Sequence, residues 1–243
     1  MSQRDARHYT IDGVRYPSVT TILGAIAKPA LVNWAAKVER EACLDAALEL
    51  LTRPGVAQSR DVFFAEWEST VKQQRAATKA KEAAGDIGRA VHALIESDLR
   101  EELGLPSKGA EQLAGVPATD TAYLHWLEWR DQHKVKPLRT EFVVCHPSAG
   151  YAGTADLLAE VDGAVTLLDF KTGRAVYPEA HLQLVAYAHA APSDPPIEAG
   201  LILRLPKTDA DPTFDAVPVD VWNEGFWSVF LAVKRLWEWW HAA

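Results

Sequence analysis

Apolar residues recur along the chain with two different periods, and the change of period divides the sequence. Before Pro137 most apolar positions return every three or four residues, the spacing that places side chains on one face of a helix. After Pro137 the pattern becomes strand-like, with short apolar runs separated by turn residues. The sequence therefore predicts a helical N-terminal part followed by a part that contains a sheet.

The N-terminal part is predicted to begin with a hairpin and to continue as helices. Residues 9–16 alternate around Asp12-Gly13, a pair typical of tight hairpin turns, and Ser18 has the character of a helix N-cap. Helices are expected over residues 30–51, 61–79, 86–99 and 119–133. A continuation of the second helix into the third is left open, although Gly85 and Gly88 weaken the join. Residues 103–118, rich in Gly and Pro, are predicted to be a surface connection.

The C-terminal part is predicted to alternate strands with helices. Strands are expected over residues 139–146, 151–160, 164–170, 199–205 and 213–219, and helices over 178–190 and from Val221 onward. This order indicates an α/β core with an N-terminal helical subdomain. The last helix carries an apolar stripe, which we expect to pack on the core rather than to stack on bases: Phe226, Phe230, Val233, Trp237 and Trp240.

The charge of the chain does not decide whether its partner is a nucleic acid. The formal net charge of −8 at pH 7 disfavours nucleic acid, because phosphate contacts usually depend on Lys and Arg. Binding is local, however, and Lys72, Arg75 and Lys79 fall at helical spacing, which predicts one basic stripe. A second basic stretch covers residues 130–139. Carboxylates that hold divalent cations also add negative charge, which the bound ions offset.

Several other classes of site are disfavoured. No apolar run is long enough to cross a bilayer, and the N-terminus lacks the apolar segment of a secretory signal. Two distant cysteines, Cys43 and Cys145, suit neither a disulfide framework nor a CxxC zinc site. We expect a cytoplasmic protein with no membrane partner, in a bacterium or, for a phage-encoded chain, in its host.

Two carboxylates and a lysine lie on neighbouring predicted strands. Asp169 and Lys171 are two residues apart, so both side chains leave the same face. The turn at Asp162-Gly163 brings Asp156 close to Asp169. Such carboxylates repel each other unless a cation lies between them, and their oxygens favour magnesium, manganese or calcium. With Lys171 to position a water and stabilise charge on phosphate oxygens, the residues predict a site for phosphodiester hydrolysis.

These motifs resemble a known family of enzymes. Asp156 with Asp169-Phe170-Lys171 resembles the signature of the PD-(D/E)XK nuclease superfamily. The segment Gly88–His92 and the pair Gln183 and Tyr187 resemble the RecB-like branch, which has an extra metal-binding histidine and a Gln-x-x-x-Tyr helix. Residues 17–23 and Glu141 are similar to mitochondrial genome maintenance exonucleases and to stand-alone phage and bacterial exonucleases. The resemblance covers residues 17 to about 235.

The resemblance implies a role for each matching residue. The expected metal ligands are His92, Asp156, Asp169 and the backbone carbonyl of Phe170. Lys171 would orient water, and Glu141 would reach the metal through water or hold a second cation. Gln183 and Tyr187 would support the lysine and touch the DNA backbone. The expected DNA-binding residues are Ser18, Thr20, Lys72, Arg75, Lys79 and Arg89.

The resemblance also implies a fold and an activity. A restriction-endonuclease-like α/β core, with a mixed central sheet flanked by helices, is expected over residues 137–243. Residues 1–136 are expected to form one wall of a DNA groove and to supply His92. The implied enzyme is a deoxyribonuclease that uses Mg²⁺ or Mn²⁺, an exonuclease acting on single-stranded or flapped DNA ends in repair, recombination or replication. A helicase or recombination protein is a candidate partner. Because the chain lacks a four-cysteine cluster and a P-loop, neither an iron–sulfur cluster nor a nucleotide cofactor is expected.

Plainer interpretations exist for each residue. A histidine on an apolar helix face is more often a core residue, and Asp169 with Lys171 is also what a surface ion pair looks like. Asp156 alone fits a turn residue, and Glu96, four residues after His92, is expected to form a salt bridge. Two other functions also remain: a catalytically silent module that binds DNA ends, and a metallohydrolase that acts on a small phosphorylated substrate.

Overall fold

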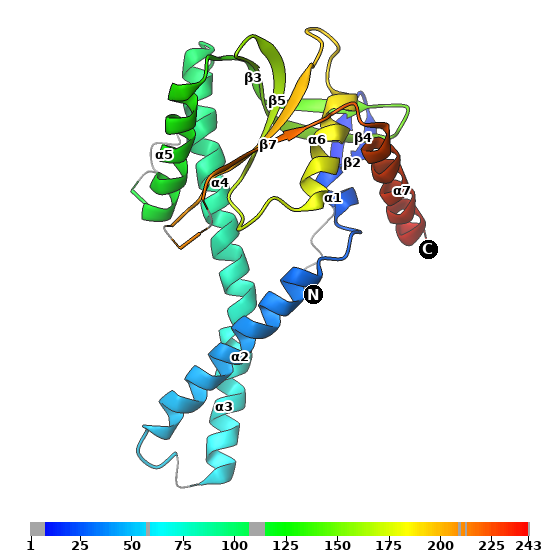
Figure 1. The fold of residues 1–243 in the computed structure, drawn as a ribbon. Coiled ribbons are helices and arrows are strands. Elements are labelled where there is room, and N and C mark those ends of the chain that lie inside the picture. Colours follow the sequence, from blue (N-terminus) through cyan, green and yellow to red (C-terminus); the bar gives the residue numbers. More distant parts are fainter. Residues whose placement is uncertain (1–7, 57–58, 107–114, 209, 212, 243) are drawn as a thin grey trace. The chain divides into compact units, whose positions relative to one another are not determined.

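The computed structural model describes residues 8–56, 59–106, 115–208, 210–211 and 213–242 (Figure 1). The chain forms two compact units, one made of residues 1–26 with 87–243 and one of residues 27–86. The division does not follow the boundary expected after residue 136, because residues 1–26 and 87–136 belong to the same unit as the sheet. The groove wall expected from residues 1–136 stays a prediction.

The N-terminal hairpin has the expected turn and leads into a short helix. Strands β1 (His8–Ile11) and β2 (Val14–Pro17) are antiparallel, and Asp12 and Gly13 between them have φ angles of 51° and 79°. Helix α1 (Val19–Leu23) begins after Ser18, whose Oγ accepts a 3.0 Å hydrogen bond from the amide of Thr21. The predicted N-cap is confirmed.

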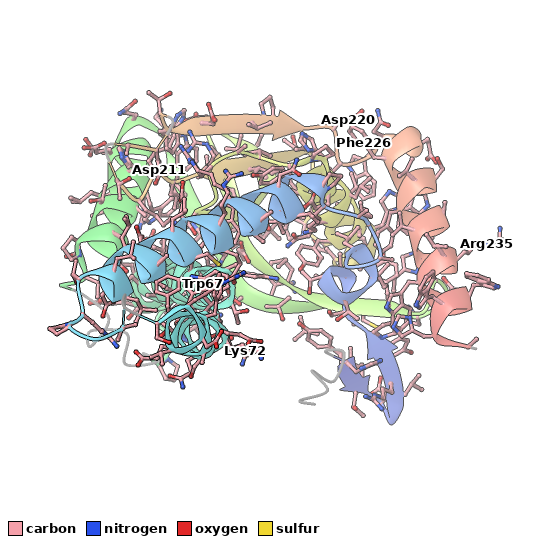
Figure 2. The ribbon with its side chains drawn as sticks, turned by 90° about the horizontal axis from the view of Figure 1, so that it is seen from below. Trp67, Lys72, Asp211, Asp220, Phe226 and Arg235 are labelled. Atoms are coloured by element: carbon pink, nitrogen blue, oxygen red, sulfur yellow. The ribbon has the colours of Figure 1, made fainter. Side chains whose placement is uncertain are left out.

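The second unit contains helix α2 (Pro29–Leu51), helix α3 (Arg60–Gln74) and the beginning of helix α4 (Ala76–Glu102). The indole of Trp67, labelled in Figure 2, donates a 3.0 Å hydrogen bond to the carbonyl of Cys43 and ties α3 to α2. The expected helix over residues 61–79 is wrong at its end, because Arg75 has a left-handed φ of 43° and separates α3 from α4. The continuation across Gly85 and Gly88 that the sequence left open is present, since α4 runs through both glycines.

The first unit is built on a five-stranded sheet in the order β3-β4-β5-β6-β7. Its strands are β3 (Val135–His146), β4 (Tyr151–Val161), β5 (Ala164–Lys171), β6 (Ala199–Arg204) and β7 (Asp215–Val219). The pair β5 and β6 is parallel, and the other neighbours are antiparallel. The parallel pair is joined through helix α6 (Pro178–Ala190), the crossover that such a pair requires. The predicted mixed sheet is confirmed.

Helices cover both faces of this sheet. On one face, Val91, Ile95 and Leu99 of α4 pack with helix α5 (Pro117–Gln132) against Phe170 and its neighbours in the sheet. On the other face, α1, α6 and helix α7 (Glu224–His241) share a second core. The spacing of four residues between these buried positions puts them on one helix face, which explains why the part of α4 from Ile87 onward packs against the sheet.

The C-terminal helix packs as expected over only part of its length. Phe230 is fully buried, and Val233 and Trp237 pack against the same core. Phe226 is 37% exposed and Trp240 is 70% exposed, so the two ends of the predicted stripe lie outside the core. Over the described residues, no helix combines the length and the apolar character that a membrane span requires.

Candidate active site

The pairing of β4 with β5 brings two carboxylates close together. The pairing ends at Leu157 and Leu168, and Asp156 and Asp169 are the next residues of the two strands, close enough for the charge of Asp156 to raise the pKa of Asp169. Asp156 Oδ2 accepts a 2.8 Å hydrogen bond from the amide of Phe170, which ties the two strands together at this point. The hairpin therefore places the two acids as the sequence predicted.

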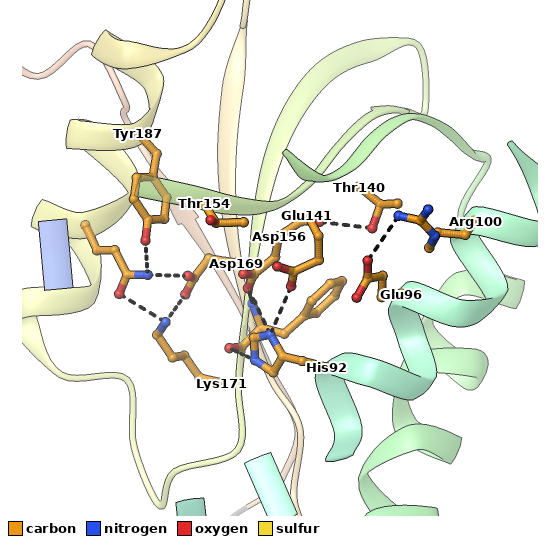
Figure 3. A network of polar contacts seen from close by, with 12 residues as sticks. His92, Glu96, Arg100, Thr140, Glu141, Thr154, Asp156, Asp169, Lys171 and Tyr187 are labelled. Carbon is orange, nitrogen blue, oxygen red and sulfur yellow. Dashed lines mark hydrogen bonds and ion pairs between the residues drawn. The ribbon is translucent and has the colours of Figure 1, made fainter. Parts of the chain in front are cut away.

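Helix α4 brings His92 to the same place. His92 follows the buried Val91, so it lies at the edge of the helix face that packs on the sheet. Its Nδ1 is 3.6 Å from Asp156 Oδ2 and 3.9 Å from Glu141 Oε1 (Figure 3). Its Nε2 is 3.0 Å from the carbonyl oxygen of Phe170. An N–H at Nε2 that donates to this carbonyl leaves Nδ1 directed at the carboxylates.

Glu141 reaches the site through an unusual backbone conformation. Its φ is 43°, in the left-handed region of backbone conformation that residues other than glycine rarely adopt. Its neighbours Thr140 and Phe142 pair regularly with Leu157 and Ala155 on β4, so the distortion is confined to this residue. Such strain persists where the surrounding structure imposes it, and it is common at functional sites.

His92, Glu141 and Asp156 form a group that fits a divalent cation. Each offers one ligand atom, and these atoms all lie within 4.8 Å of one another. Two ligands on opposite sides of an ion are about 4.2 Å apart for Mg²⁺ and about 5 Å apart for Ca²⁺. The three ligand atoms therefore need to move only slightly closer together to share one divalent cation.

The electrostatics of His92 also favour a positive charge among these carboxylates. Burial acts to lower the pKa of His92, but the charge of Asp156 and the hydrogen bond to Glu141 outweigh it and raise the pKa to about 9. The carboxylates thus stabilise a positive charge at the imidazole. A metal ion placed among them would take over that role.

Lys171 belongs to a second arm of the site. Its Nζ is 2.5 Å from Asp169 Oδ2 and donates a 3.2 Å hydrogen bond to Gln183 Oε1 (Figure 3). Gln183 Nε2 lies 3.0 Å from Asp169 Oδ1 and 3.2 Å from the hydroxyl of Tyr187. Asp169 and Lys171 therefore share a face, as predicted, and α6 supplies the side chain that connects them.

The charges of this arm are set by burial and by each other. Burial raises the pKa of Asp169 to about 6, although Lys171 acts to lower it. Burial acts to lower the pKa of Lys171, but Asp169 and Asp156 outweigh it, so that pKa lies above its usual value. At neutral pH the pair is ionised, and Lys171 carries a positive charge beside the two acids.

Comparison with known proteins agrees with this site. The family model of the PD-(D/E)XK nuclease superfamily matches residues 62–217, more than half of the chain. The chain belongs to the PD-(D/E)XK nuclease superfamily. Among curated proteins, none matches the chain significantly. Membership indicates a metal-dependent nuclease with a restriction-endonuclease-like core, and a nuclease of this family binds DNA.

Within this PD-(D/E)XK site, two expected metal ligands have other partners. Asp169 is not in the group of three ligand atoms, because its carboxylate meets Lys171 and Gln183. The carbonyl of Phe170 faces His92 Nε2. Glu141, expected to act through water or on a second cation, lies in the group itself. Glu96 Oε1 lies 3.3 Å from Arg100 Nη1, which confirms the expected salt bridge.

The expected DNA-binding residues belong to several elements of the two units. Ser18 is buried, and its hydroxyl bonds to Thr21 and Thr20, whereas Thr20 is exposed. Lys72, labelled in Figure 2, lies on α3 and forms a 2.6 Å ion pair with Glu68. The predicted single stripe of Lys72, Arg75 and Lys79 is wrong, because the helix ends between them at Arg75. Lys79 and Arg89 are exposed on α4.

Three residues near the acids were not predicted from the sequence. Thr140 Oγ1 donates a 3.3 Å hydrogen bond to the carbonyl of Asp156. The hydroxyls of Tyr9 and Thr154 are 2.8 Å apart, which links the N-terminal hairpin to β4 two residues before Asp156. Tyr9 and Thr154 are 145 positions apart in the chain, so no local pattern reveals their contact.

Proposed function

We propose that this nuclease hydrolyses DNA phosphodiester bonds with Mg²⁺ or Mn²⁺ held by His92, Asp156 and Glu141. The single observation that supports it most is the convergence of these three ligand atoms, all within 4.8 Å of one another, beside a charged lysine. His92 would bind the metal through Nδ1 while Nε2 donates to the carbonyl of Phe170, an arrangement that commonly orients histidine ligands.

Asp169 stays a proposed ligand. It lies close to Asp156, but Lys171 and Gln183 engage its carboxylate. Joining the metal would require Asp169 to exchange one of these contacts. The bound cation would polarise a phosphate oxygen and lower the pKa of a coordinated water.

Lys171 would act as a charge rather than as a base. Its raised pKa keeps the ammonium protonated at neutral pH, so it cannot accept a proton from the attacking water. It can donate hydrogen bonds to that water and to the phosphate oxygens, where negative charge grows as water adds to phosphorus and the bond to the leaving oxygen breaks. Gln183 and Tyr187 would hold the ammonium in place.

We further propose that the protein is an exonuclease of the RecB-like branch. Its proposed substrates are single-stranded or flapped DNA ends that arise in repair, recombination or replication. The likeness of Gly88–His92, Gln183 and Tyr187 to that branch supports it. A helicase or recombination protein belongs to the same proposal as a partner. The proposed setting is the cytoplasm of a bacterium or of a phage host, and both cysteines are free.

The experiment compares cleavage of labelled DNA by wild type, Lys171→Ala and Lys37→Ala. Lys37 is a matched control, because it is an exposed lysine of α2 paired with Glu41. With Mn²⁺ we expect Lys171→Ala to lose at least about 100-fold in rate and Lys37→Ala to match wild type. Equal cleavage by Lys171→Ala would contradict the proposal. DNA-end binding by wild type without cleavage would favour the silent module.

Substrate form tests the exonuclease assignment. End-labelled single-stranded, duplex and flap DNA are compared with a closed single-stranded circle, which has no ends. We expect the linear and flap substrates to shorten progressively and the circle to persist. Cutting of the circle would identify an endonuclease, and failure of unlabelled DNA to compete with a small phosphate ester would favour the small-substrate hydrolase.

A further inference from the structure

We infer that Arg174 and Tyr177, in the loop of residues 172–177, form a subsite for the DNA strand beside Lys171, with Arg174 on a phosphate and Tyr177 on a base. The inference rests on the proposed nuclease function, and it concerns how the strand is held rather than how it is cut. Neither residue belongs to the site described above.

The loop is placed by the active site at both ends. It leaves β5 directly after Lys171 and leads into α6, which returns Gln183 to within 3.2 Å of Lys171 Nζ. Because Arg174 is three residues after Lys171, their Cα atoms are at most about 11 Å apart. At the 3.4 Å rise per nucleotide of a duplex strand, that distance corresponds to about three nucleotides.

Packing fixes the loop on each side of its exposed residues. The carbonyl of Lys171 accepts a 2.7 Å hydrogen bond from Leu205, and Thr172 lies so close to α4 that a Cβ on Gly88 would be 3.1 Å from its Oγ1. Val176 packs on the core, and the carbonyl of Tyr177 accepts a 2.9 Å hydrogen bond from Ala180 at the start of α6. The backbone that carries the two exposed side chains is therefore held in place before a strand binds, which lowers the entropic cost of binding.

Both side chains are available to a ligand. Arg174 is exposed, and among the described residues its guanidinium has neither an ion pair nor a hydrogen bond. An unpaired guanidinium is suited to a phosphate group, which it can bind through two parallel N–H donors. Tyr177 is 43% exposed, and its ring has no aromatic neighbour in the described part of the chain. Unpaired bases stack on such rings with little dependence on sequence.

The negative charge of the protein is a reason for a cation beside the active site. The protein has a net charge of −8, and the acids at the active site repel a polyanion. The predicted basic stripe on the helices is interrupted at Arg75. A cation in the loop next to Lys171 would attract the strand where the acids oppose it, and stacking on Tyr177 would add a contribution independent of salt.

The test measures binding of a fluorescein-labelled single-stranded oligonucleotide by anisotropy, with EDTA present so that metal-dependent cleavage cannot occur. Arg174→Gln is compared with Arg235→Gln. Arg235 is an exposed arginine of α7 with no partner among the described residues, so its variant has the same net charge (Figure 2). We expect Arg174→Gln to raise Kd about 5- to 10-fold and to reduce the slope of log K against log salt by about 0.7, the value for one phosphate contact.

Tyr177→Leu and Tyr177→Phe separate stacking from the hydroxyl. We expect Tyr177→Leu to raise Kd at least about fivefold with an unchanged salt slope, and Tyr177→Phe to bind like wild type. Equal effects of Arg174→Gln and Arg235→Gln, or of the two Tyr177 variants, would overturn the subsite. Cleavage by wild type with Mn²⁺, measured in parallel, reports separately on the proposed nuclease function.

Discussion

Gln183 accepts a 3.2 Å hydrogen bond from the ammonium of Lys171 through its Oε1. Its amide nitrogen lies 3.0 Å from Asp169 Oδ1, so one side chain contacts both members of the ion pair. The two ends of the amide match the charges they meet, with the oxygen at the cation and the nitrogen at the carboxylate. Gln183 thereby fixes the direction of Lys171 without changing its charge.

Substitution Gln183→Ala should therefore impair catalysis while leaving the metal site in place. We expect kcat to fall about 10- to 100-fold, the usual effect of removing a partner that orients a functional group. Affinity for Mn²⁺, measured by calorimetry, should change less than about threefold. Combined with Lys171→Ala, the second substitution should add little, because Gln183 acts through Lys171. Additive losses in this double-mutant cycle would contradict that role.

Glu141 offers a test that separates backbone strain from metal binding. Its φ of 43° favours glycine, so Glu141→Gly should be more stable than Glu141→Ala by about 1–2 kcal/mol in urea unfolding. Both variants should lose affinity for Mn²⁺, because both remove a proposed ligand. A glutamate on β4, Glu160, is the control, since glycine there should be less stable than alanine by about 0.5–1 kcal/mol. The same order at both positions would argue against strain at Glu141.

The local pattern of the sequence was enough to predict much of the fold. Helix α6 begins and ends at the predicted residues 178 and 190, and every predicted strand is present within a few residues of its expected ends. The closeness of Asp156 and Asp169 followed from a two-residue turn, Asp162-Gly163, and from the pairing of β4 with β5 up to Leu157 and Leu168. Short turns and strand periodicity are local properties, so the sequence expresses them directly.

Conformations imposed by tertiary contacts were not predictable in this way. The sequence left a helix across Gly85 and Gly88 open because glycine weakens it, yet α4 runs through both, and Val91, Ile95 and Leu99 pack it against the core. The left-handed conformations of Arg75 and Glu141 have no signal in residue type. The pairing of Asp169 with Lys171 and Gln183 also depends on where α6 lies. Helix propensity is a weak guide once an element is packed against a core.

Close packing of Tyr187 on β4 leads to a third prediction. A Cβ on Gly153 would lie 2.5 Å from Tyr187 Cε1, too close without movement of the ring, and Tyr187 is buried. Gly153→Ala should destabilise the protein by about 1–3 kcal/mol in urea unfolding and reduce activity by displacing Tyr187. Combination with Tyr187→Leu, which removes the ring, should recover part of that stability. A full additive loss in the double variant would show that the ring is not the obstacle.

The imidazole of His92 gives the metal-free protein a dependence on pH. Burial acts to lower its pKa, but Asp156 and Glu141 raise it to about 9, above the value of about 6.5 for an unfolded histidine. The folded protein therefore holds this proton more tightly than the unfolded chain does. The resulting stability is fully present below about pH 6.5 and is lost as the pH rises through about 9. Asp169 titrates lower, near pH 6, and contributes outside this window.

Urea unfolding with EDTA should measure this contribution as a fall of about 1–3 kcal/mol in the free energy of unfolding between pH 6.5 and pH 9.5, beyond that of His92→Gln. Metal binding should show the complementary trend, because a ligand histidine must give up its proton. The apparent affinity for Mn²⁺ should rise up to about tenfold per pH unit from pH 6.5 toward pH 9 in wild type and stay flatter in His92→Gln. If the apparent affinity for Mn²⁺ does not change with pH in this range, His92 is not a ligand of the metal, whatever its distance from Asp156 and Glu141.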